Sequence, residues 1–468
     1  MPCAFHLERP LPFQDLDPGC PFPQSSFPKF APDLIEFDGK EWCPFHLPME
    51  SADGSPSPKA DWDGKQIKKF NGAIFAFIDK AKEKDRPADL TGVVFPGDIW
   101  FDRYRDETSA LPPISFARAQ FSGADFEKTQ FSGDARFGKA QFSGNVGFHE
   151  AQFSGDADFW EAQFSGEAWF HEARFNSYTW FFGTQFSGPA DFSEAQFSRD
   201  AVFFGAQFSS GASFSRAQFS IDANFAGAPS VDEGGNSSEN RDLGDRFHWV
   251  TFAGAKFDGS ASFANRRFLD TTDFSECVFT TAPEFYNCVL HQDTDFTEAQ
   301  FTDTTSKDAV RAYRTLKLAM EQVRAGDEQA MFYALEMECR RKRKDTPLSV
   351  KVFSRLYERA ADYGRSFTRP LGWLSETAGI FFLVYLICFA ALTTGGLGEQ
   401  DVGDIGRFTM RQIVPPFDAF TLGPTEGLPT GLSRLPLWLG FVAMIQSILS
   451  LGLIALFILA LRRRFRMG

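Results

Sequence analysis

The sequence predicts a three-part protein: a repeat solenoid filled with phenylalanine, a basic helical neck, and two membrane-spanning helices near the C-terminus. The chain has 57 phenylalanines in 468 residues, and this excess of one aromatic residue indicates that a repeated local environment selects it. Two long apolar stretches close to the C-terminus have the length of a membrane span. A repeat solenoid does not contain apolar stretches of this length, so we expect them to form a separate membrane-spanning region.

The N-terminal segment, residues 1–92, contains the pattern Cys-x-x-His twice. Each copy can bind a metal from one turn, and two copies together supply the Cys₂His₂ set that zinc prefers. The surroundings are rich in Pro and Asp and poor in core-forming residues, so a structural zinc ion would help this cap to fold. Cys20 could substitute for either cysteine. The predicted ligands are Cys3, His6, Cys43 and His46.

The central segment, residues 93–303, repeats phenylalanine at alternating spacings of five and six. The resulting unit reads Ala-Gln-Phe-Ser-Gly-x-Ala-x-Phe-x-Glu, with a small residue two positions before each phenylalanine. This period fits neither an α-helix nor an ordinary strand. An acidic Gly/Ser/Asn-rich insertion, residues 226–246, interrupts it and is predicted to be a solvated loop. Typical core positions of the repeat are Phe121, Phe142, Phe153, Phe164, Phe175, Phe186, Phe197, Phe208 and Phe219.

This A-x-F-x-x pattern resembles the pentapeptide-repeat family over about residues 94–302. The resemblance implies a right-handed quadrilateral β-helix in which the phenylalanine and the small residue both point into the shaft. Two units per coil would make the coil about 22 residues long instead of the usual 20, with two slightly widened corners. Cys277 and Cys288 occupy the slot of the small residue, so we expect buried thiols and no disulfide. His149 and His171 lie one coil apart and should stack on one outer face, which could in principle hold a metal.

The neck, residues 304–369, has apolar residues at helical spacing with a break at Gly326-Asp327. This pattern predicts a helical hairpin. Its basic end is expected to meet anionic lipid head groups, and a nucleic-acid patch is the less favoured alternative. The basic end consists of Arg340, Arg341, Lys342, Arg343 and Lys344.

Residues 371–394 and 435–461 are predicted to span a membrane. Basic residues are concentrated before the first span and after the second, where Arg462, Arg463 and Arg464 stand, whereas the loop 395–434 has few. The positive-inside rule therefore places both termini and the solenoid in the cytoplasm. The segments flanking the spans resemble bacterial pentapeptide-repeat membrane proteins, which implies a bacterial inner membrane. Seven scattered cysteines agree with a reducing cytoplasm.

The loop between the spans contains a candidate short amphipathic helix, Arg407–Phe417, ending at two prolines. Such a helix could lie on the bilayer surface, which is the favoured interpretation. Alternatively it could insert between the spans, as in two-helix ion channels. The segment Gly403–Gly406 does not match the TVGYG filter of potassium channels.

The sequence shows no nucleophile–base pairing and no phosphate-binding glycine loop, so we do not expect an enzyme. Acidic residues outnumber basic ones about two to one in the repeats, and the chain has a net charge of −14. The favoured function is a membrane-anchored scaffold, a homo-oligomer whose acidic solenoid binds a partner with a basic surface. One alternative is an oligomeric two-helix channel or membrane-permeabilising effector with the solenoid as sensor. Another is a DNA-mimicking inhibitor of gyrase, as the resemblance implies, although the membrane anchor disfavours it and direct nucleic-acid binding is not expected.

Overall fold

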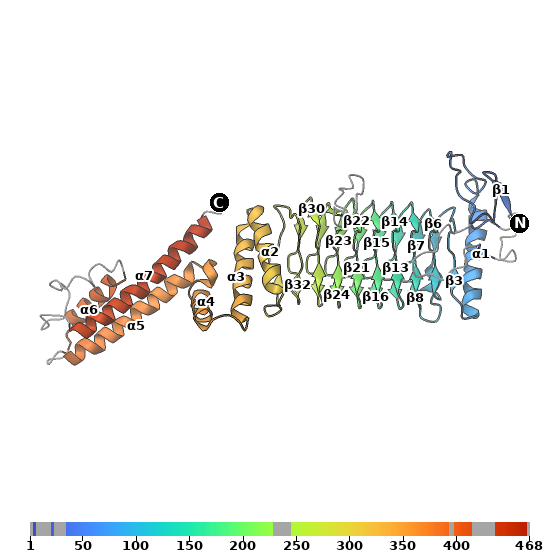
Figure 1. Cartoon of the computed structure of the whole chain (residues 1–468). Helices are drawn as coiled ribbons and strands as arrows, with labels where there is room; N and C mark the ends of the chain where they lie inside the picture. Colours follow the sequence, from blue (N-terminus) through green and yellow to red (C-terminus); the bar gives the residue numbers. More distant parts are fainter. Residues whose placement is uncertain are drawn as a thin grey trace. The chain divides into compact units, whose positions relative to one another are not determined.

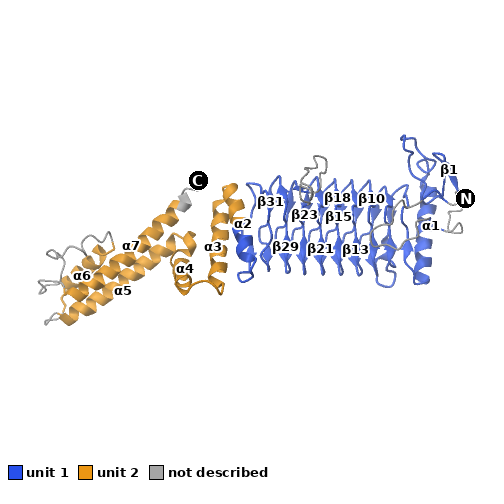
Figure 2. Ribbon diagram, viewed as in Figure 1, with its two compact units in different colours: residues 1–315 blue, residues 316–468 orange. Residues whose placement is uncertain are grey.

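The computed structural model describes residues 3–5, 20–22, 34–227, 245–392, 397–413 and 436–465. The chain divides into two compact units, residues 1–315 and 316–468 (Figure 2).

The first unit begins with a small cap at the N-terminal end of the solenoid (Figure 1). Strands β1 (Ile35–Phe37) and β2 (Lys40–Trp42) form an antiparallel hairpin. Helix α1 (Gly64–Glu83) starts at Asp63, whose carboxylate accepts from the backbone N–H of Gln66 while the Gln66 side chain accepts in return. This capping box defines where the helix begins. The ring of Phe70 on α1 packs against Phe95, so the helix covers the open end of the shaft.

The solenoid is built from two-residue strands in four parallel sheets, one on each side of the coil (Figure 1). Face 1 consists of β6 (Gln120–Phe121), β10 (Gln141–Phe142), β14 (Gln163–Phe164), β18 (Gln185–Phe186), β22 (Gln207–Phe208), β26 (Arg246–Phe247) and β30 (Arg267–Phe268). Face 2 consists of β4 (Ile99–Trp100), β7 (Ala124–Asp125), β11 (Val146–Gly147), β15 (Ala168–Trp169), β19 (Ala190–Asp191), β23 (Ala212–Ser213), β27 (Val250–Thr251) and β31 (Thr272–Asp273). Face 3 consists of β8 (Gln130–Phe131), β12 (Gln152–Phe153), β16 (Arg174–Phe175), β20 (Gln196–Phe197), β24 (Gln218–Phe219), β28 (Lys256–Phe257), β32 (Val278–Phe279) and β33 (Gln300–Phe301). Face 4 consists of β3 (Ala88–Asp89), β5 (Ile114–Ser115), β9 (Ala135–Arg136), β13 (Ala157–Asp158), β17 (Thr179–Trp180), β21 (Ala201–Val202), β25 (Ala223–Asn224) and β29 (Ala261–Ser262).

The strand register confirms the long coil expected from the sequence. Phe142 pairs with Phe164 and Ala157 with Thr179, each 22 residues further along the chain. Phenylalanines one coil apart lie nearly parallel, as Phe137 and Phe159 do at 4.9 Å between ring centroids and 2° between ring planes. Rings on adjacent faces meet edge to face, so each ring has both offset-stacked and T-shaped neighbours. The nine phenylalanines named above are at most 2% exposed.

The two kinds of corner differ in backbone geometry. In the five-residue corner, Glu150 has φ 52°, and the N–H of Ala151 donates to the carbonyl of Phe148 at 3.0 Å, as in a type II turn. In the six-residue Ser-Gly corner, a Cβ on Gly155 would lie 2.4 Å from the carbonyl carbon of Gly133 one coil below. Glycine therefore allows these two coils to approach closely here, whereas Ser177 and Arg199 stand at the same corner in the next two coils.

The shaft continues past the insertion, because Phe214 stacks on Phe252 at 5.0 Å across it. Residues 228–244, most of the predicted loop, lie outside the described residues. Less than one coil after the insertion, Arg266 occupies the slot of the small residue and is completely buried. Its guanidinium donates to three backbone carbonyls, those of Phe203, Ala206 and Phe225.

The second unit contains most of the helices. Helix α2 (Ala309–Gln322) crosses the border between the units and is followed by α3 (Gly326–Lys342), α4 (Leu348–Ala361) and the 3₁₀ turn Asp362–Gly364. Long apolar helices α5 (Thr368–Leu392) and α7 (Leu437–Phe465) flank the shorter α6 (Glu399–Arg411). By length and composition, α5 and α7 could each cross a membrane. The helix predicted at 407–417 therefore begins earlier, at Glu399, and Gly403–Gly406 lies inside it rather than in a filter loop.

Candidate functional site

Four potential zinc ligands come together in the N-terminal cap: Cys3, Cys20, Cys43 and His46. Their ligand atoms all lie within 4.8 Å of one another. The sulfurs of Cys20 and Cys43 are 3.7 Å apart, and Nδ1 of His46 lies 3.2 Å from Cys43 Sγ and 3.8 Å from Cys3 Sγ. A tetrahedral zinc ion with Zn–S bonds of about 2.3 Å needs sulfurs about 3.8 Å apart. The residues present therefore fit a tetrahedral metal ion.

Local backbone structure positions the ligands. Cys43 directly follows β2, and the turn after it is closed by hydrogen bonds from the N–H groups of His46 and Leu47 to the Cys43 carbonyl. This turn places Sγ and Nδ1 on the same side. The N–H of Cys43 donates to Cys3 Sγ at 3.1 Å, and the N–H of Ala4 donates to the Glu41 carbonyl. The N-terminal segment is thereby held along β2.

The second nitrogen of His46 is also engaged, because Nε2 lies 2.9 Å from the carbonyl oxygen of Thr91. A carbonyl at this position fixes the tautomer that leaves Nδ1 as the metal ligand. The ring of Phe5 stacks on the imidazole at 3.9 Å. Since Thr91 follows β3, the first strand of face 4, the cluster links the cap to the solenoid.

Without a metal, the cluster favours one thiolate and two neutral thiols. Hydrogen bonds from Cys20 and Cys43 lower the pKa of Cys3 far below its usual value. The same contact with Cys3 raises the pKa of Cys20 to about 11, and contacts with Cys20 and Cys3 together with burial raise the pKa of Cys43. One thiolate is thus stabilised at the expense of the other two. A divalent cation would stabilise all three in the charged form.

Three of the four predicted ligands, Cys3, Cys43 and His46, are brought together as expected. His6 lies outside the described residues. The fourth ligand in the cluster is Cys20, the cysteine that the sequence offered as a substitute. Its signal was a second Cys-Pro-Phe sequence, without a histidine, since Cys20-Pro-Phe repeats the start of Cys43-Pro-Phe-His.

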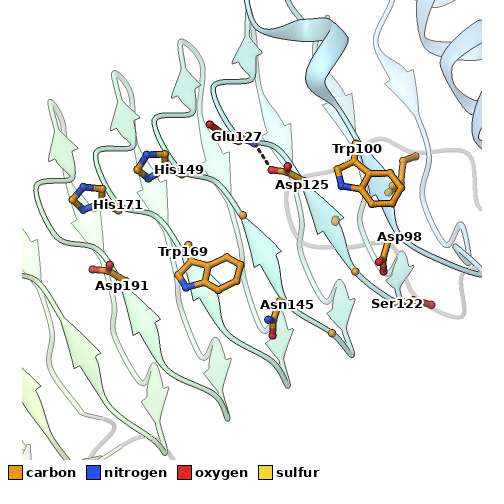
Figure 3. A pocket seen from close by; sticks show the side chains of 15 residues that line it. Asp98, Trp100, Ser122, Asp125, Glu127, Asn145, His149, Trp169, His171 and Asp191 are labelled. Carbon is orange, nitrogen blue, oxygen red and sulfur yellow. Dashed lines mark hydrogen bonds between the residues drawn. The ribbon is translucent and has the colours of Figure 1, made fainter.

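A shallow groove of about 820 Å³ runs along face 2 (Figure 3). Trp100 and Trp169 project from β4 and β15, with exposures of 56% and 39%, and Gly147 on β11 leaves the space between them open. His149 and His171 border it, and their rings stack at 5.0 Å, which confirms the expected pairing. Each histidine Nε2 lies 3.1 Å from the following glutamate. Among the described residues, a group of three or more His, Cys, Asp or Glu side chains that could hold a metal ion occurs only in the cap.

The outward carboxylates of the repeats are partly neutralised within the solenoid. Glu150 pairs with Lys128 at 3.3 Å, Glu161 with Lys139 at 3.2 Å, and Glu194 with Arg216 at 3.1 Å. Exposed ion pairs of this kind contribute little to stability, but they reduce the charge that the corners present. The groove is less compensated, since its lining includes Asp98, Asp125 and Asp191 and no lysine or arginine.

Four of the five basic residues at the end of the neck form ion pairs. Arg340 binds the fully buried Glu336, Lys342 binds Glu338, and Arg343 binds Asp345. Arg341, 11% exposed, binds Glu358 and donates to the Tyr363 hydroxyl, and so joins α3 to α4. Of the second basic cluster, Arg462 is exposed, and the side chains of Arg463 and Arg464 lie outside the described residues.

The four parallel sheets around a filled shaft define the class of protein, a parallel β-helix. A family model of pentapeptide repeats in nine copies matches residues 113–152, 137–185 and 181–229. By this match and by their fold, residues 113–229 are pentapeptide repeats that form a solenoid. No curated protein and no solved structure matches the chain. The coils themselves extend beyond the matched residues, to Phe301 on β33.

Proposed function

We propose that this protein anchors an acidic pentapeptide-repeat solenoid to a membrane and presents it to a partner with a basic surface. The exposure of α5 and α7 is the observation that carries the proposal. Only 11% and 22% of their apolar windows are buried, and large side chains such as Ile387 (68%) and Phe441 (62%) are exposed. A helix of a soluble domain buries its apolar face, so these helices require lipid around them.

Helix α4 supports the same conclusion. Its side chains Leu348, Phe353 and Leu356 are 77%, 72% and 57% exposed, and Lys351 and Arg355 lie beside them on the same helix. An amphipathic helix with an exposed apolar face and basic flanks is suited to the membrane interface. We propose that α4 lies on the leaflet where α5 enters.

The orientation follows from the basic residues that precede α5 and end α7. In this proposal both termini and the solenoid are cytoplasmic, at a bacterial inner membrane. Green fluorescent protein fused after residue 468 should fluoresce, and alkaline phosphatase inserted in the loop 395–434 should be active. Replacing Arg462, Arg463 and Arg464 with glutamate should reduce both signals. Active phosphatase at residue 468 would contradict the orientation.

The groove on face 2 is the part of the solenoid best suited to a basic partner. The faces of Trp100 and Trp169 can contact a cation, and the carboxylates of Asp125 and Asp191 can pair with it. The shaft itself offers no space, because the phenylalanines fill it. Recognition must therefore occur on the outside of the coils.

A deca-arginine peptide serves as a probe of this surface. We expect calorimetry on the full-length protein in detergent to show salt-sensitive binding, weakened about tenfold by Trp169→Ala combined with Asp125→Asn and Asp191→Asn. Trp180→Ala on face 4 is the matched control and should bind as the unmodified protein does. Equal losses in both variants would contradict a role of the groove.

We propose that zinc is the metal held by Cys3, Cys20, Cys43 and His46. Three sulfurs and one nitrogen in tetrahedral spacing support zinc over calcium or magnesium, which prefer oxygen ligands. Four protein ligands leave no open position for substrate, so the site would be structural.

An oligomeric channel is the second candidate function, and one observation favours it. Helix α6 packs against α5 and α7 in a shared core that includes Tyr385, Phe389, Ile405, Phe408 and Leu439. Recordings on the purified protein in planar bilayers would test this function. The absence of conductance under any voltage or salt gradient would reject it.

A further inference from the structure

We infer that α6 is a re-entrant helix that enters the apolar layer beside α5 and α7, and that further copies of this chain enclose its charged face. This inference rests on the proposal that α5 and α7 cross a membrane. It identifies the surface through which copies of the chain would assemble.

The C-terminal turn of α6 is held by a polar site on α7. The side-chain amide of Gln446 donates to the carbonyl of Thr409 at 3.1 Å, and the Tyr385 hydroxyl of α5 donates to the amide oxygen of Gln446 at 2.8 Å. The last carbonyls of a helix have no partner within the helix. The Thr409 carbonyl also accepts from the N–H of Gln412 at 3.2 Å, so Gln446 adds a second donor and ties the end of α6 to α7.

A second contact strengthens this attachment, because the Ser447 hydroxyl donates to the side-chain oxygen of Gln412 at 3.1 Å. Gln446, Ser447 and Gln412 are 0%, 2% and 5% exposed. Polar groups inside a membrane helix are costly and usually serve a purpose. Here the two polar residues of the otherwise apolar α7, Gln446 and Ser447, hydrogen-bond to the C-terminal end of α6.

The position of these contacts along the long helices gives the depth of α6. Tyr385 lies seven residues before Leu392, where α5 ends, and Gln446 lies nine residues after Leu437, where α7 begins. At about 1.5 Å per residue, the contacts lie about 10–13 Å inside the helix ends. The apolar layer is about 30 Å thick. The end of α6 is therefore well inside it, whereas a helix on the bilayer surface would not reach Gln446.

One face of α6 packs against α5 and α7. Ile405 and Phe408 are buried against α5 and α7, and the ring of Phe408 meets that of Tyr385 edge to face at 5.1 Å. The other face carries Asp404, Arg407 and Arg411. Arg407 pairs with Asp404 at 3.4 Å, yet its side chain remains 76% exposed.

Charged side chains at this depth face protein or water rather than lipid, since an arginine at the centre of a membrane helix costs about 3 kcal/mol or more. Among the described residues, α5 and α7 pack against the opposite face. The occupant we propose for the charged face is another copy of the chain, because a face bearing both charge signs can pair with the same face of a copy. The copies would enclose water around this face.

The test uses the full-length protein reconstituted in liposomes and in mild detergent. We expect native mass spectrometry to show a closed oligomer. We also expect Met410→Cys, on the exposed face of α6, to react with a membrane-impermeant thiol reagent above the background of the unmodified chain. Ile448→Cys, 59% exposed on α7, is the control and should not react, because it faces lipid. A monomer, or an oligomer with an unreactive Met410→Cys, would overturn the inference.

A second variant separates insertion of α6 from surface binding. Gln446→Leu keeps α7 apolar but cannot donate to Thr409, so the oligomer should dissociate at roughly tenfold higher protein concentration than the unmodified chain. An unchanged oligomer would overturn the inference. The fusion reporters at residue 468 and in the loop 395–434 show whether α5 and α7 cross the membrane. They therefore distinguish a failure of the membrane proposal from a failure of the inference about α6.

Discussion

Replacing Cys43 with serine should abolish zinc binding and open the N-terminal cap. Cys43 contacts Cys20 and His46 through its sulfur and Cys3 through its N–H, so its loss removes the ligand at the centre of the cluster. Structural zinc sites contribute on the order of 10 kcal/mol to the folding of small domains. We expect one zinc ion per unmodified chain by elemental analysis, none in the variant, and rapid proteolysis around residues 34–62 after the substitution or after chelation.

Matched variants identify the fourth ligand. Cys20→Ser should lower zinc affinity about 100-fold or more, whereas His6→Ala should leave one zinc ion bound. Cys277→Ser is the control for loss of a buried thiol elsewhere, since Cys277 only donates to the Phe252 carbonyl inside the solenoid. Loss of zinc in His6→Ala but not in Cys20→Ser would restore the ligand set predicted from the sequence and contradict the one in the structure.

Replacing Arg266 with methionine should destabilise the solenoid more than any other single substitution of an arginine in it. The side chain is completely buried, lies 4.4 Å from the centre of the Phe247 ring, and supplies donors to three carbonyls. Burial lowers the pKa of its guanidinium to about 9, because the interior of the shaft disfavours the charged form. With methionine the Phe203 carbonyl keeps the N–H of Ala206 at 3.0 Å. The carbonyls of Ala206 and Phe225 each lose the guanidinium donor at about 1–3 kcal/mol, so we expect a total loss of about 2–5 kcal/mol.

Urea denaturation of the full-length protein in detergent, followed by circular dichroism, measures this loss. Arg267→Met is the matched control, because Arg267 is the neighbouring residue and its side chain is exposed; we expect a change within about 0.5 kcal/mol. Arg266→Lys should fall between the two, since one ammonium cannot reproduce the planar set of donors. An Arg266→Met variant as stable as the Arg267→Met variant would show that the carbonyls of Ala206 and Phe225 find other partners.

The repeat could be predicted in detail because a strict period leaves few geometries. Phe142 and Phe164 occupy the same position of the repeat and are 22 residues apart. Stacking one on the other therefore also aligns all the remaining positions of the two coils. The buried Cys277 and the stacked pair of His149 and His171 follow from the same register. The packing role of the corner glycines could not be predicted from the repeat. The close contact between Gly155 and Gly133 arises only when one coil stacks on the next.

Contacts between segments without a period could not be predicted in this way. The choice of Cys20 depends on how three irregular segments meet, and the pattern Cys-x-x-His reports only neighbours within one turn. Arg266 stands two residues before Phe268, so the period places it in an inward slot, but the period does not show which carbonyls its guanidinium meets beside the interrupted coil. The basic run 340–344 reads as a lipid contact, whereas Arg341 is held by Glu358 on another helix.

By itself, the sequence determined the coil length, the inward residues, the two apolar spans and the pairing of Cys43 with His46, because each depends on a local period or spacing. The tertiary structure alone decided the fourth ligand, the carbonyl partners of Arg266 and the packing of α6 against Gln446. These depend on which groups meet over long separations in the chain. Burial then requires each polar group to find a partner there, whatever its position in the sequence.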